Sequence, residues 1–336
     1  MLRYAVVGSG AVGCFYGIRL AAAGAPVQFL FRHGAELVRA RGLRLDSPDG
    51  DLHVAAPRIA SDWDGLDPCD VLVLATKATA NPDVLARLAT RSERLVAPSG
   101  AVLLVQNGIG AEPALADAAG GRQVLGGLAF LCSRQVGPGH VEHLDYGALT
   151  IAAHAPGEAP GGVTPVMRAI AEDLAAAGTT AHLDEDLVRA RWRKLMWNIP
   201  FNPLSVILAA ATDELVGDPG TEALIGTIMA EVAAAAAAEG RPLPDALPGE
   251  LLAATRRMAP YDTSMKLDAD AGRPLEVDAM LGEPLRRAAR SGTAMPAVSV
   301  LHQQLSLLDR RIRARGRVSP GAGEAPAAPS VDAHSD

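Results

Sequence analysis

A short stretch in the middle of the chain, RWRKLMWNIPFNP (residues 191–203), contains polar side chains at a regular spacing. Lys194, Asn198 and Asn202 recur every fourth residue. On a helix this spacing brings the lysine and Asn198 to one face and Asn202 near it. A lysine in a site could donate a proton to a reacting oxygen. Two prolines predict a kink near Pro200, which leaves the direction of Asn202 open, and the alternative is an amphipathic helix with a solvated lysine.

Two further polar side chains, Ser264 and Glu276, lie in the second half of the chain. Ser264 belongs to a predicted loop with the sequence YDTSM (residues 261–265). Glu276 follows the sequence GRPL and is predicted in the first turn of a helix. A carboxylate in a first turn is also favoured by the helix dipole, so its position alone does not establish a function.

A glycine-rich turn near the N-terminus indicates a phosphate site. An apolar strand at residues 3–7 precedes the turn, and a helix at residues 11–23 follows it. The turn consists of Gly8, Ser9, Gly10, Ala11, Val12 and Gly13. The first glycine permits the turn, the second lets a phosphate approach the backbone, and the third lets helix and strand pack closely. A GxGxxG string is weak evidence alone, but between a strand and a helix it predicts a dinucleotide site.

Arg32 follows the second predicted strand, at residues 27–31. NAD enzymes usually have an acidic residue at this point, which accepts hydrogen bonds from the adenosine ribose hydroxyls. An arginine instead offers a planar fork to a 2′-phosphate and therefore favours NADP(H). The alternative is an arginine that only caps an edge loop.

Lys77 and Asn107 follow two further buried strands, at residues 70–75 and 101–105. Ligands of an open parallel sheet bind beyond the carboxyl ends of its strands, so both side chains are predicted to point toward the cofactor crevice. Asn-Gly also favours turns for its own reasons, which leaves turn chemistry as the alternative.

The remaining patterns predict an α/β protein: a Rossmann-type dinucleotide-binding domain followed by an all-helical domain. In the first domain we also expect a helix at 35–41, a hairpin of 43–45 with 52–54, strands at 124–131, 140–144 and 149–152, a helix at 163–177 and a strand at 179–183. The helices of the second domain are expected at 185–199, 203–210, 220–240, 248–258, 275–291 and 297–315. We therefore predict domains at residues 1–183 and 184–316 and a disordered tail at 317–336.

Composition excludes several classes of function. The chain has 336 residues and a formal net charge of −7, which argues against a nucleic-acid partner. No apolar run is long enough for a membrane span, and no signal peptide precedes the first strand, so a cytoplasmic protein is expected. Three scattered cysteines fit a reducing compartment. His140 and His143 have no third ligand nearby in sequence, so no metal site is predicted.

Taken in order, these motifs resemble those of the ketopantoate reductase (2-dehydropantoate 2-reductase) family over nearly all of residues 1–315. Each motif is modest, and their order and spacing together are specific. The matching segments are GSGAVG (8–13), Arg32, TKA (76–78), VQNGIG (105–110), PGH (138–140), RWRKLMWNIPFNPLS (191–205), TSM (263–265) and RPLEVD (273–278).

The resemblance implies NADPH-dependent reduction of ketopantoate to pantoate, in pantothenate and coenzyme A biosynthesis. It implies that Lys194 is the catalytic acid and that Glu276 helps to orient the lysine and the reacting oxygen. It further implies that Asn107 and Asn198 position substrate and cofactor, that Ser264 binds the substrate carboxylate, and that Asn202 supports the site. An ammonium suits this reaction because hydride addition to a 2-oxo carbon leaves an alkoxide that must be protonated.

The sequence also departs from the family pattern. Thr212-Asp213-Glu214 stands where well-known members have Asn-Gly-Glu, and Tyr261 lies where an additional asparagine for the substrate can occur. Two alternatives therefore stay open: reduction of another branched 2-oxo acid, and non-catalytic sensing of NADP(H). The sequence also allows a homodimer through the helical domain but contains no decisive patch for it.

Overall fold

The first half of the chain folds into one mixed sheet. Short runs rich in valine and leucine form its central strands, which are buried on both faces. The computed structural model describes residues 1–318, and within them the sheet has ten strands in the order β4-β3-β9-β8-β7-β6-β1-β2-β5, with β10 beside β9. The strands are β1 (Tyr4–Val7), β2 (Val27–Leu30), β3 (Leu43–Asp46), β4 (Leu52–Val54), β5 (Arg58–Ala60), β6 (Cys69–Leu74), β7 (Val96–Leu104), β8 (Gln123–Gly137), β9 (His140–Ala153) and β10 (Ala181–Asp184).

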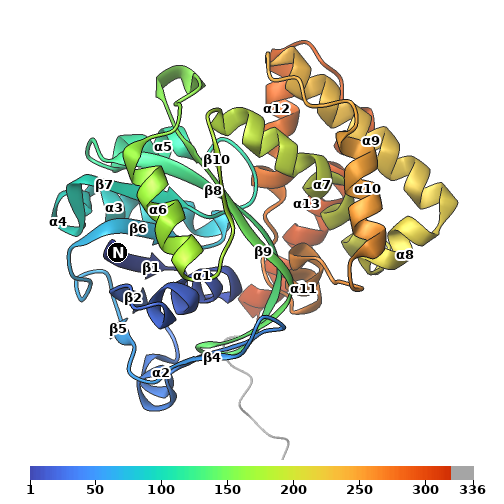
Figure 1. Cartoon of the computed structure of the whole chain (residues 1–336). Helices are drawn as coiled ribbons and strands as arrows, with labels where there is room; N and C mark the ends of the chain where they lie inside the picture. The colour runs from blue at the N-terminus through green and yellow to red at the C-terminus, as the bar shows by residue number, and fades with distance from the viewer. Residues whose placement is uncertain (319–336) are drawn as a thin grey trace, which may run out of the picture.

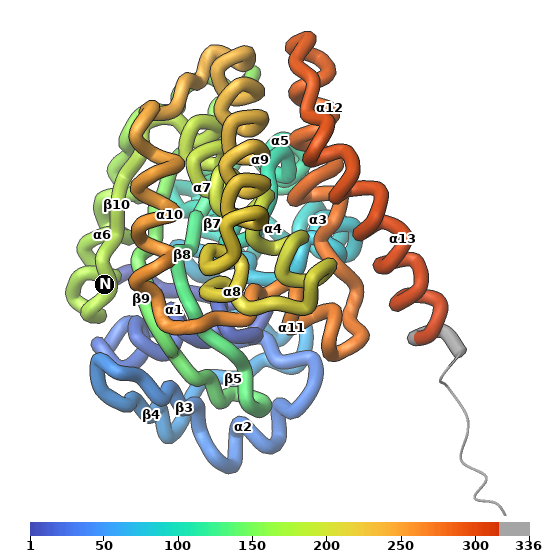
Figure 2. The backbone as a smooth tube through the Cα atoms, turned by 90° about the vertical axis from the view of Figure 1, so that its right-hand side faces the viewer, coloured from blue at the N-terminus to red at the C-terminus, as the bar shows by residue number. Residues whose placement is uncertain are grey.

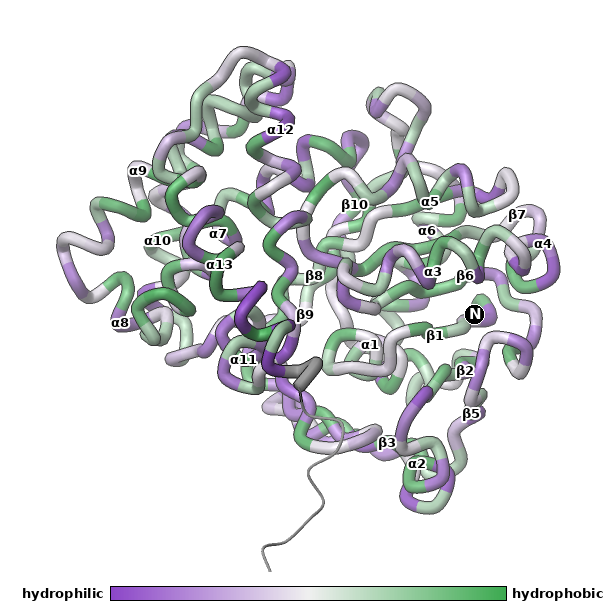
Figure 3. Tube along the Cα trace, turned by 180° about the vertical axis from the view of Figure 1, so that it is seen from behind, coloured by the Kyte–Doolittle hydropathy of each residue, from purple (hydrophilic) through white to green (hydrophobic). Residues whose placement is uncertain are grey.

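The strands from β5 through β2, β1, β6 and β7 to β8 pair in parallel, in the order typical of dinucleotide-binding domains. Figure 1 shows helices on both faces of this sheet. The helices of this half are α1 (Ala11–Ala22), α2 (Ala35–Arg41), α3 (Asn81–Ala89), α4 (Ser92–Leu95), α5 (Glu112–Ala118) and α6 (Pro165–Ala176), with short 3-10 turns η1 (Ala78–Ala80) and η2 (Pro156–Glu158). Apolar residues are concentrated on central strands such as β1 and β6 (Figure 3). The predicted Rossmann-type α/β fold is confirmed.

The strands predicted at 124–131, 140–144 and 149–152 are in fact two long antiparallel strands, β8 and β9. Their pairing contains register shifts, one of them between Phe130 and Leu131, and Tyr146 opposite has a positive φ of 59°. These irregularities interrupt the alternation of apolar residues, which explains why the sequence suggested separate strands. The hairpin of β3 and β4 was predicted correctly.

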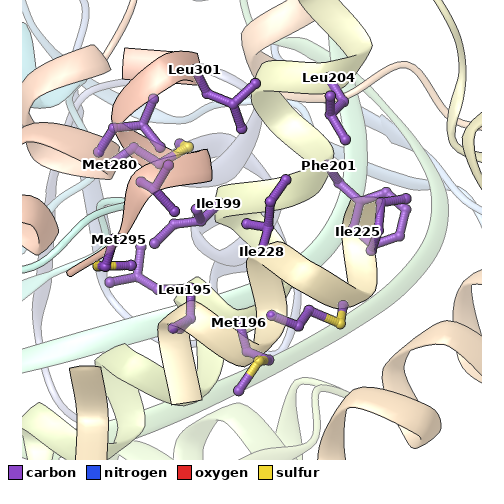
Figure 4. Packing of buried hydrophobic residues seen from close by; sticks show 14 of the residues in the cluster. Leu195, Met196, Ile199, Phe201, Leu204, Ile225, Ile228, Met280, Met295 and Leu301 are labelled. Carbon is purple, nitrogen blue, oxygen red and sulfur yellow. The ribbon is translucent and has the colours of Figure 1, made fainter. Parts of the chain in front are cut away.

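The second half of the chain is helical and packs around α7 (Figure 1). Its elements are α7 (Leu187–Ile207), α8 (Thr212–Gly217), α9 (Pro219–Ala238), α10 (Leu247–Arg257), α11 (Ser264–Asp270), the π-helical turn η3 (Asp278–Gly282), α12 (Glu283–Arg290) and α13 (Pro296–Val318). Figure 2 shows α9 and α10 side by side in front of α7, with α13 along one edge. Figure 4 shows the apolar core between α7, α9 and the last helices, with Leu195, Ile199 and Ile228 among its members.

The predicted break between helices 185–199 and 203–210 is wrong, because α7 is continuous through Pro200 and Pro203. Both prolines are buried, and the surrounding core holds the segment in helical conformation against its low propensity. Two side chains also bond to backbone carbonyls here, Asn202 Nδ2 to Asn198 O at 3.2 Å and Ser205 Oγ to Asn202 O at 2.9 Å.

Three smaller predictions are corrected. The segment around Ser264 is not a loop throughout, since Ser264 is the first residue of α11 and Thr263 caps it. Glu276 lies just before the helical turn rather than within it, and its carbonyl accepts the bond from Met280 N. The tail predicted at 317–336 begins too early, because α13 continues to Val318; residues 319–336 lie outside the described part of the chain.

One described helix, α9, is long and apolar enough to cross a membrane by length and composition alone. It supplies Ile225, Ile228, Met229 and Val232 to the core of the helical half. This is the role expected of a core helix in a globular domain.

Candidate active site

A cavity of about 810 Å³ opens between the sheet and α7, beyond the carboxyl ends of β1, β6 and β7. It brings together residues from both halves of the chain, from Val7 to Glu276. The predicted site residues on its wall are Gly8, Ser9, Gly10, Ala11, Val12, Arg32, Lys77, Asn107, Lys194, Asn198, Asn202, Ser264 and Glu276. Gly13 is not part of the wall.

The glycine turn has the backbone geometry that a close ligand requires. Gly8 has a φ of 101°, and a Cβ there would lie 2.4 Å from the backbone nitrogen of Thr76. A Cβ on Gly10 would meet nothing within 4 Å, so this position leaves open space beside the start of α1. A Cβ on Gly13 would lie 2.2 Å from Gly8 O, which explains its role in close packing. The turn therefore fits a pyrophosphate at the N-terminus of α1.

Arg32, which follows β2, is exposed and lines the cavity at the end of that strand. Ser9 Oγ donates to Leu30 O at 2.7 Å and fixes the glycine turn against the end of this strand. Gln135 of β8 donates to Ser9 O at 3.1 Å, so the long hairpin borders the same end. Arg32 is thus available to a phosphate in the cavity.

Asn107 follows β7 in a loop held by contacts with both halves of the molecule. Asn198 Nδ2 of α7 donates to Asn107 Oδ1 at 3.5 Å, and Ile109 N donates to Ala279 O of the π-helical turn at 3.3 Å. A Cβ on Gly108 would lie 2.4 Å from the same Ala279 carbonyl, so the close approach requires glycine. π-Helical turns are frequent at functional sites, and this one meets the loop beside the cavity.

Lys77 and Glu276 face one another across the two halves. Lys77 Nζ lies 2.5 Å from Asp268 Oδ2 and 3.9 Å from Glu276 Oε2, and Glu276 Oε1 accepts from Ala78 N at 2.6 Å. Burial raises the pKa of Glu276, while the charge of Lys77 opposes this rise. Lys77 is therefore engaged in an ion-pair network and is still about half exposed to the cavity, with 45% of its side chain accessible.

Lys194 is half-buried on the cavity wall, one turn before Asn198 on the same helix. The pKa of Lys194 is lowered to about 7, chiefly by burial and also by the neighbouring Arg191 charge, while Glu276 acts in the opposite direction. An ammonium with a pKa near neutrality is suited to giving up a proton. The prediction that Lys194 and Asn198 share a face is confirmed, since both line the cavity.

Asn202 and Ser264 also reach the cavity, and a buried hydroxyl chain runs from Asn202 to Thr263, the residue before Ser264. Ser205 Oγ donates to Asn202 O, and it lies 2.6 Å from Thr263 Oγ1, beside Ser264. Asn202 is almost fully buried, and its Oδ1 has no partner within the described residues.

Sequence reasoning missed several residues of the site. Asp268 pairs with Lys77, and Arg191 forms a buried ion pair with Glu112. Trp197 and Met258 line the same cavity as Lys194 and Tyr261. Trp197 could have been found from its position three residues after Lys194, whereas Asp268 is paired over 191 positions and no local pattern indicates it.

No cluster of three or more metal-ligating side chains occurs among residues 1–318. His140 Nε2 lies 2.8 Å from Asp46 Oδ2, and His143 bonds to Ser47 Oγ and Tyr146 O. Both histidines therefore have ordinary hydrogen-bonding roles in the hairpin.

Comparison with known proteins matches both parts of the chain to one family. The family model "Ketopantoate reductase PanE/ApbA" matches residues 4–156, and the model of the family's C-terminal part matches residues 186–309. The 2-dehydropantoate 2-reductase of Nostoc sp. is 42% identical over 93% of this chain and 96% of its own length.

Solved structures of proteins with the same name are similar to this chain in sequence and fold. The 2-dehydropantoate 2-reductase of Geobacter metallireducens is 35% identical, with a TM-score of 0.84 over 92% of this chain and 99% of its own. The protein of that name from Methylococcus capsulatus is 33% identical, with a TM-score of 0.82 over 93% and 98% of the two chains. Matching family models, identities and folds over nearly the whole described chain show that it belongs to the ketopantoate reductase family.

Proposed function

We propose that this protein reduces ketopantoate to pantoate with NADPH and that Lys194 is the general acid. The observation that carries the proposal is the cavity wall itself, where a half-buried lysine and a dinucleotide-type glycine turn occur together. NADPH, when bound, supplies the hydride that adds to the 2-oxo carbon. Lys194 stabilises the developing alkoxide and then donates its proton to that oxygen.

The other residues of the site orient the substrate, the cofactor and Lys194. We propose that Asn198 and Asn107 orient the substrate beside the cofactor, and that Ser264 donates a hydrogen bond to the substrate carboxylate. Glu276 orients Lys194 and also binds the cofactor, and Asn202 supports the substrate end from its place on the cavity wall. The glycine turn and Lys77 contribute to the cofactor site, and Arg32 binds the 2′-phosphate. We also propose that the substrate part of this machinery is a second domain that starts near residue 184.

The choice of substrate is tested by a panel of 2-oxo acids with NADPH. Reduction of ketopantoate with the highest kcat/KM supports the proposed reaction. A higher value for another branched 2-oxo acid favours the alternative substrate; Trp197, Met258 and Tyr261 are large side chains on the cavity wall that would contact a branched substrate. One methylene in a pocket changes discrimination by only about 1–3 kcal/mol, so the panel must include close analogues.

The reaction is expected to depend on pH through Lys194. Because the pKa of Lys194 is lowered to about 7, its protonated fraction decreases as the pH rises through this value. We therefore expect kcat/KM for reduction to fall by about tenfold per pH unit on the alkaline side, and oxidation of pantoate to gain activity there. A reduction rate that stays constant from about pH 6 to pH 9 would contradict the assigned acid.

Replacement of Arg32 by alanine tests the cofactor preference. We expect NADPH affinity to fall by about 10–100-fold, because charge-assisted bonds to the 2′-phosphate are lost, while NADH affinity stays roughly unchanged. Fluorescence titration of both cofactors measures the two values. The matched control is Arg39→Ala, which removes an exposed arginine paired with Glu36 on α2. Equal losses for NADPH and NADH would refute the role of Arg32.

We propose a cytoplasmic location, supported by three free cysteines that are all buried. Self-association as a homodimer is also proposed, with support from the exposed apolar side chains Val300 and Leu307 on one face of α13. Light scattering on the purified protein tests this assembly.

A further inference from the structure

A buried ion pair joins the two halves of the molecule beside the active site. Arg191 of α7 and Glu112 of α5 are 2% and 3% exposed. Arg191 Nη2 lies 2.6 Å from Glu112 Oε1, and its Nε donates to the same oxygen at 2.8 Å. Arg191 belongs to the helical half and Glu112 to the half that contains the sheet, so this pair fixes α7, which carries Lys194, against the nucleotide-binding half.

The same guanidinium also holds the end of β7. Arg191 Nη1 donates to Gln106 O at 2.5 Å, and Nη2 donates to Leu104 O at 3.5 Å. Asn107 follows these carbonyls directly and meets Asn198 of α7. The helix is therefore attached to the strand end at Arg191 and again two turns later at Asn198, and Lys194 lies between the two attachments.

We propose that Arg191 and Glu112 form a positioning pair that controls the place and the protonation of Lys194. This inference rests on the proposed role of Lys194 as the acid. Arg191 itself does not touch the cavity, since it does not belong to the wall formed by the other residues of α7. It acts through the helix and through its charge.

The positive charge of Arg191 affects the pKa of Lys194 in one direction. Arg191 precedes Lys194 by three residues, which places both cations on one side of the helix. Its charge lowers the pKa of Lys194, and Glu112 opposes this effect because it neutralises Arg191. The other charged group that acts on Lys194 is Glu276, just before the π-helical turn. Glu276 is in turn affected by Lys77 after β6 and by Asp268 of α11. Glu112 is affected by His154.

A purely structural pair and a tuning pair give different pH profiles. If the pair only packs the two halves together, its loss lowers kcat. The alkaline limb, which is the fall of the reduction rate above the pKa of Lys194, then stays at the same pH. Loss of the Arg191 charge should raise the pKa of Lys194 and move this limb to higher pH. Loss of the Glu112 charge should leave Arg191 unopposed and move the limb to lower pH.

The experiment uses Glu112→Gln, Arg191→Met and the double variant, with Arg193→Met as matched control. Arg193 is an exposed arginine on the same helix, directly before Lys194. Steady-state kinetics of ketopantoate reduction give kcat, KM and the alkaline limb. Reductive methylation of Lys194 at a series of pH values, followed by peptide mass spectrometry, gives its protonation in the free protein without turnover.

We expect the limb to move by roughly one pH unit, downward for Glu112→Gln and upward for Arg191→Met and for the double variant. We also expect kcat to fall by about 10–100-fold in Arg191→Met, since small displacements of a catalytic group have large effects, with little change in KM. Arg193→Met should match the parent protein in every value.

Unchanged limbs and unchanged methylation profiles in all three variants would overturn the inference. If Arg191→Met does not fold, the shift of the alkaline limb in Glu112→Gln tests the inference instead. Glutamine has the same shape as glutamate and keeps an acceptor for Arg191. If the methylation profile shifts as expected but the parent protein has no 2-oxo acid reductase activity, the proposed function fails and the positioning pair does not.

Discussion

Replacement of Lys194 by alanine is expected to reduce kcat for ketopantoate reduction by about 10³-fold, within the range of general acid catalysis. The alkoxide that forms at the 2-oxo carbon would then have to take its proton from water, and it would lose a nearby positive charge. NADPH affinity should change little, because the glycine turn and Arg32 are separate from α7 along the cavity wall. Steady-state kinetics and NADPH fluorescence titration measure the two effects.

Arg193→Ala is the matched control for this variant. It removes the cation of the residue directly before Lys194 on α7, one that is exposed and does not line the cavity. Both variants should keep the same melting temperature to within a few degrees. A Lys194→Ala protein with more than about a tenth of the parent kcat would show that another group protonates the product.

Glu276→Gln should reduce kcat by about 10²-fold and move the alkaline limb of the pH profile to lower pH. Glutamine keeps an acceptor for Ala78 N, so the backbone contact at 2.6 Å can persist. The carboxylate charge is lost, however, and this charge raises the pKa of Lys194. Without it, Lys194 loses its proton at a lower pH and is less often in the acid form at neutrality.

The control for Glu276 is Glu250→Gln in the first turn of α10. Glu250 is exposed in the first turn of a helix, where the helix dipole alone favours a carboxylate. It therefore represents a glutamate without a role in the site. Its replacement should leave kcat and the pH profile unchanged. If Glu276→Gln also kept the parent kcat and pH profile and differed only in stability, the carboxylate would have only a structural role.

Local patterns predicted the parts of the fold that local chemistry determines. The strand, glycine turn and helix around Gly8 were predicted within about one residue, because glycine geometry and apolar runs act over short distances. The continuity of α7 was not predictable from its sequence, since Pro200 and Pro203 are held in the helix by buried packing from distant elements. The seven residues of α11 are too few to give a clear helical period.

In the candidate site, too, local features were predicted and long-range contacts were not. Lys194, Asn198 and Glu276 were found because polar residues among apolar ones stand out in sequence, and the family resemblance connected them. Their partners were not found, because those contacts cross the two halves of the chain. Lys77 meets Asp268 over 191 positions, and Arg191 meets Glu112 over 79. No spacing rule connects residues so far apart.

The most direct test of the proposed function is the oxidation of NADPH by the purified protein, followed at 340 nm with and without ketopantoate. We predict loss of NADPH only when ketopantoate is present, in step with formation of pantoate, and its near absence in Lys194→Ala. NADPH that binds tightly but is not consumed with ketopantoate or any other 2-oxo acid, at any pH, would contradict the proposal and indicate a protein that only senses the cofactor.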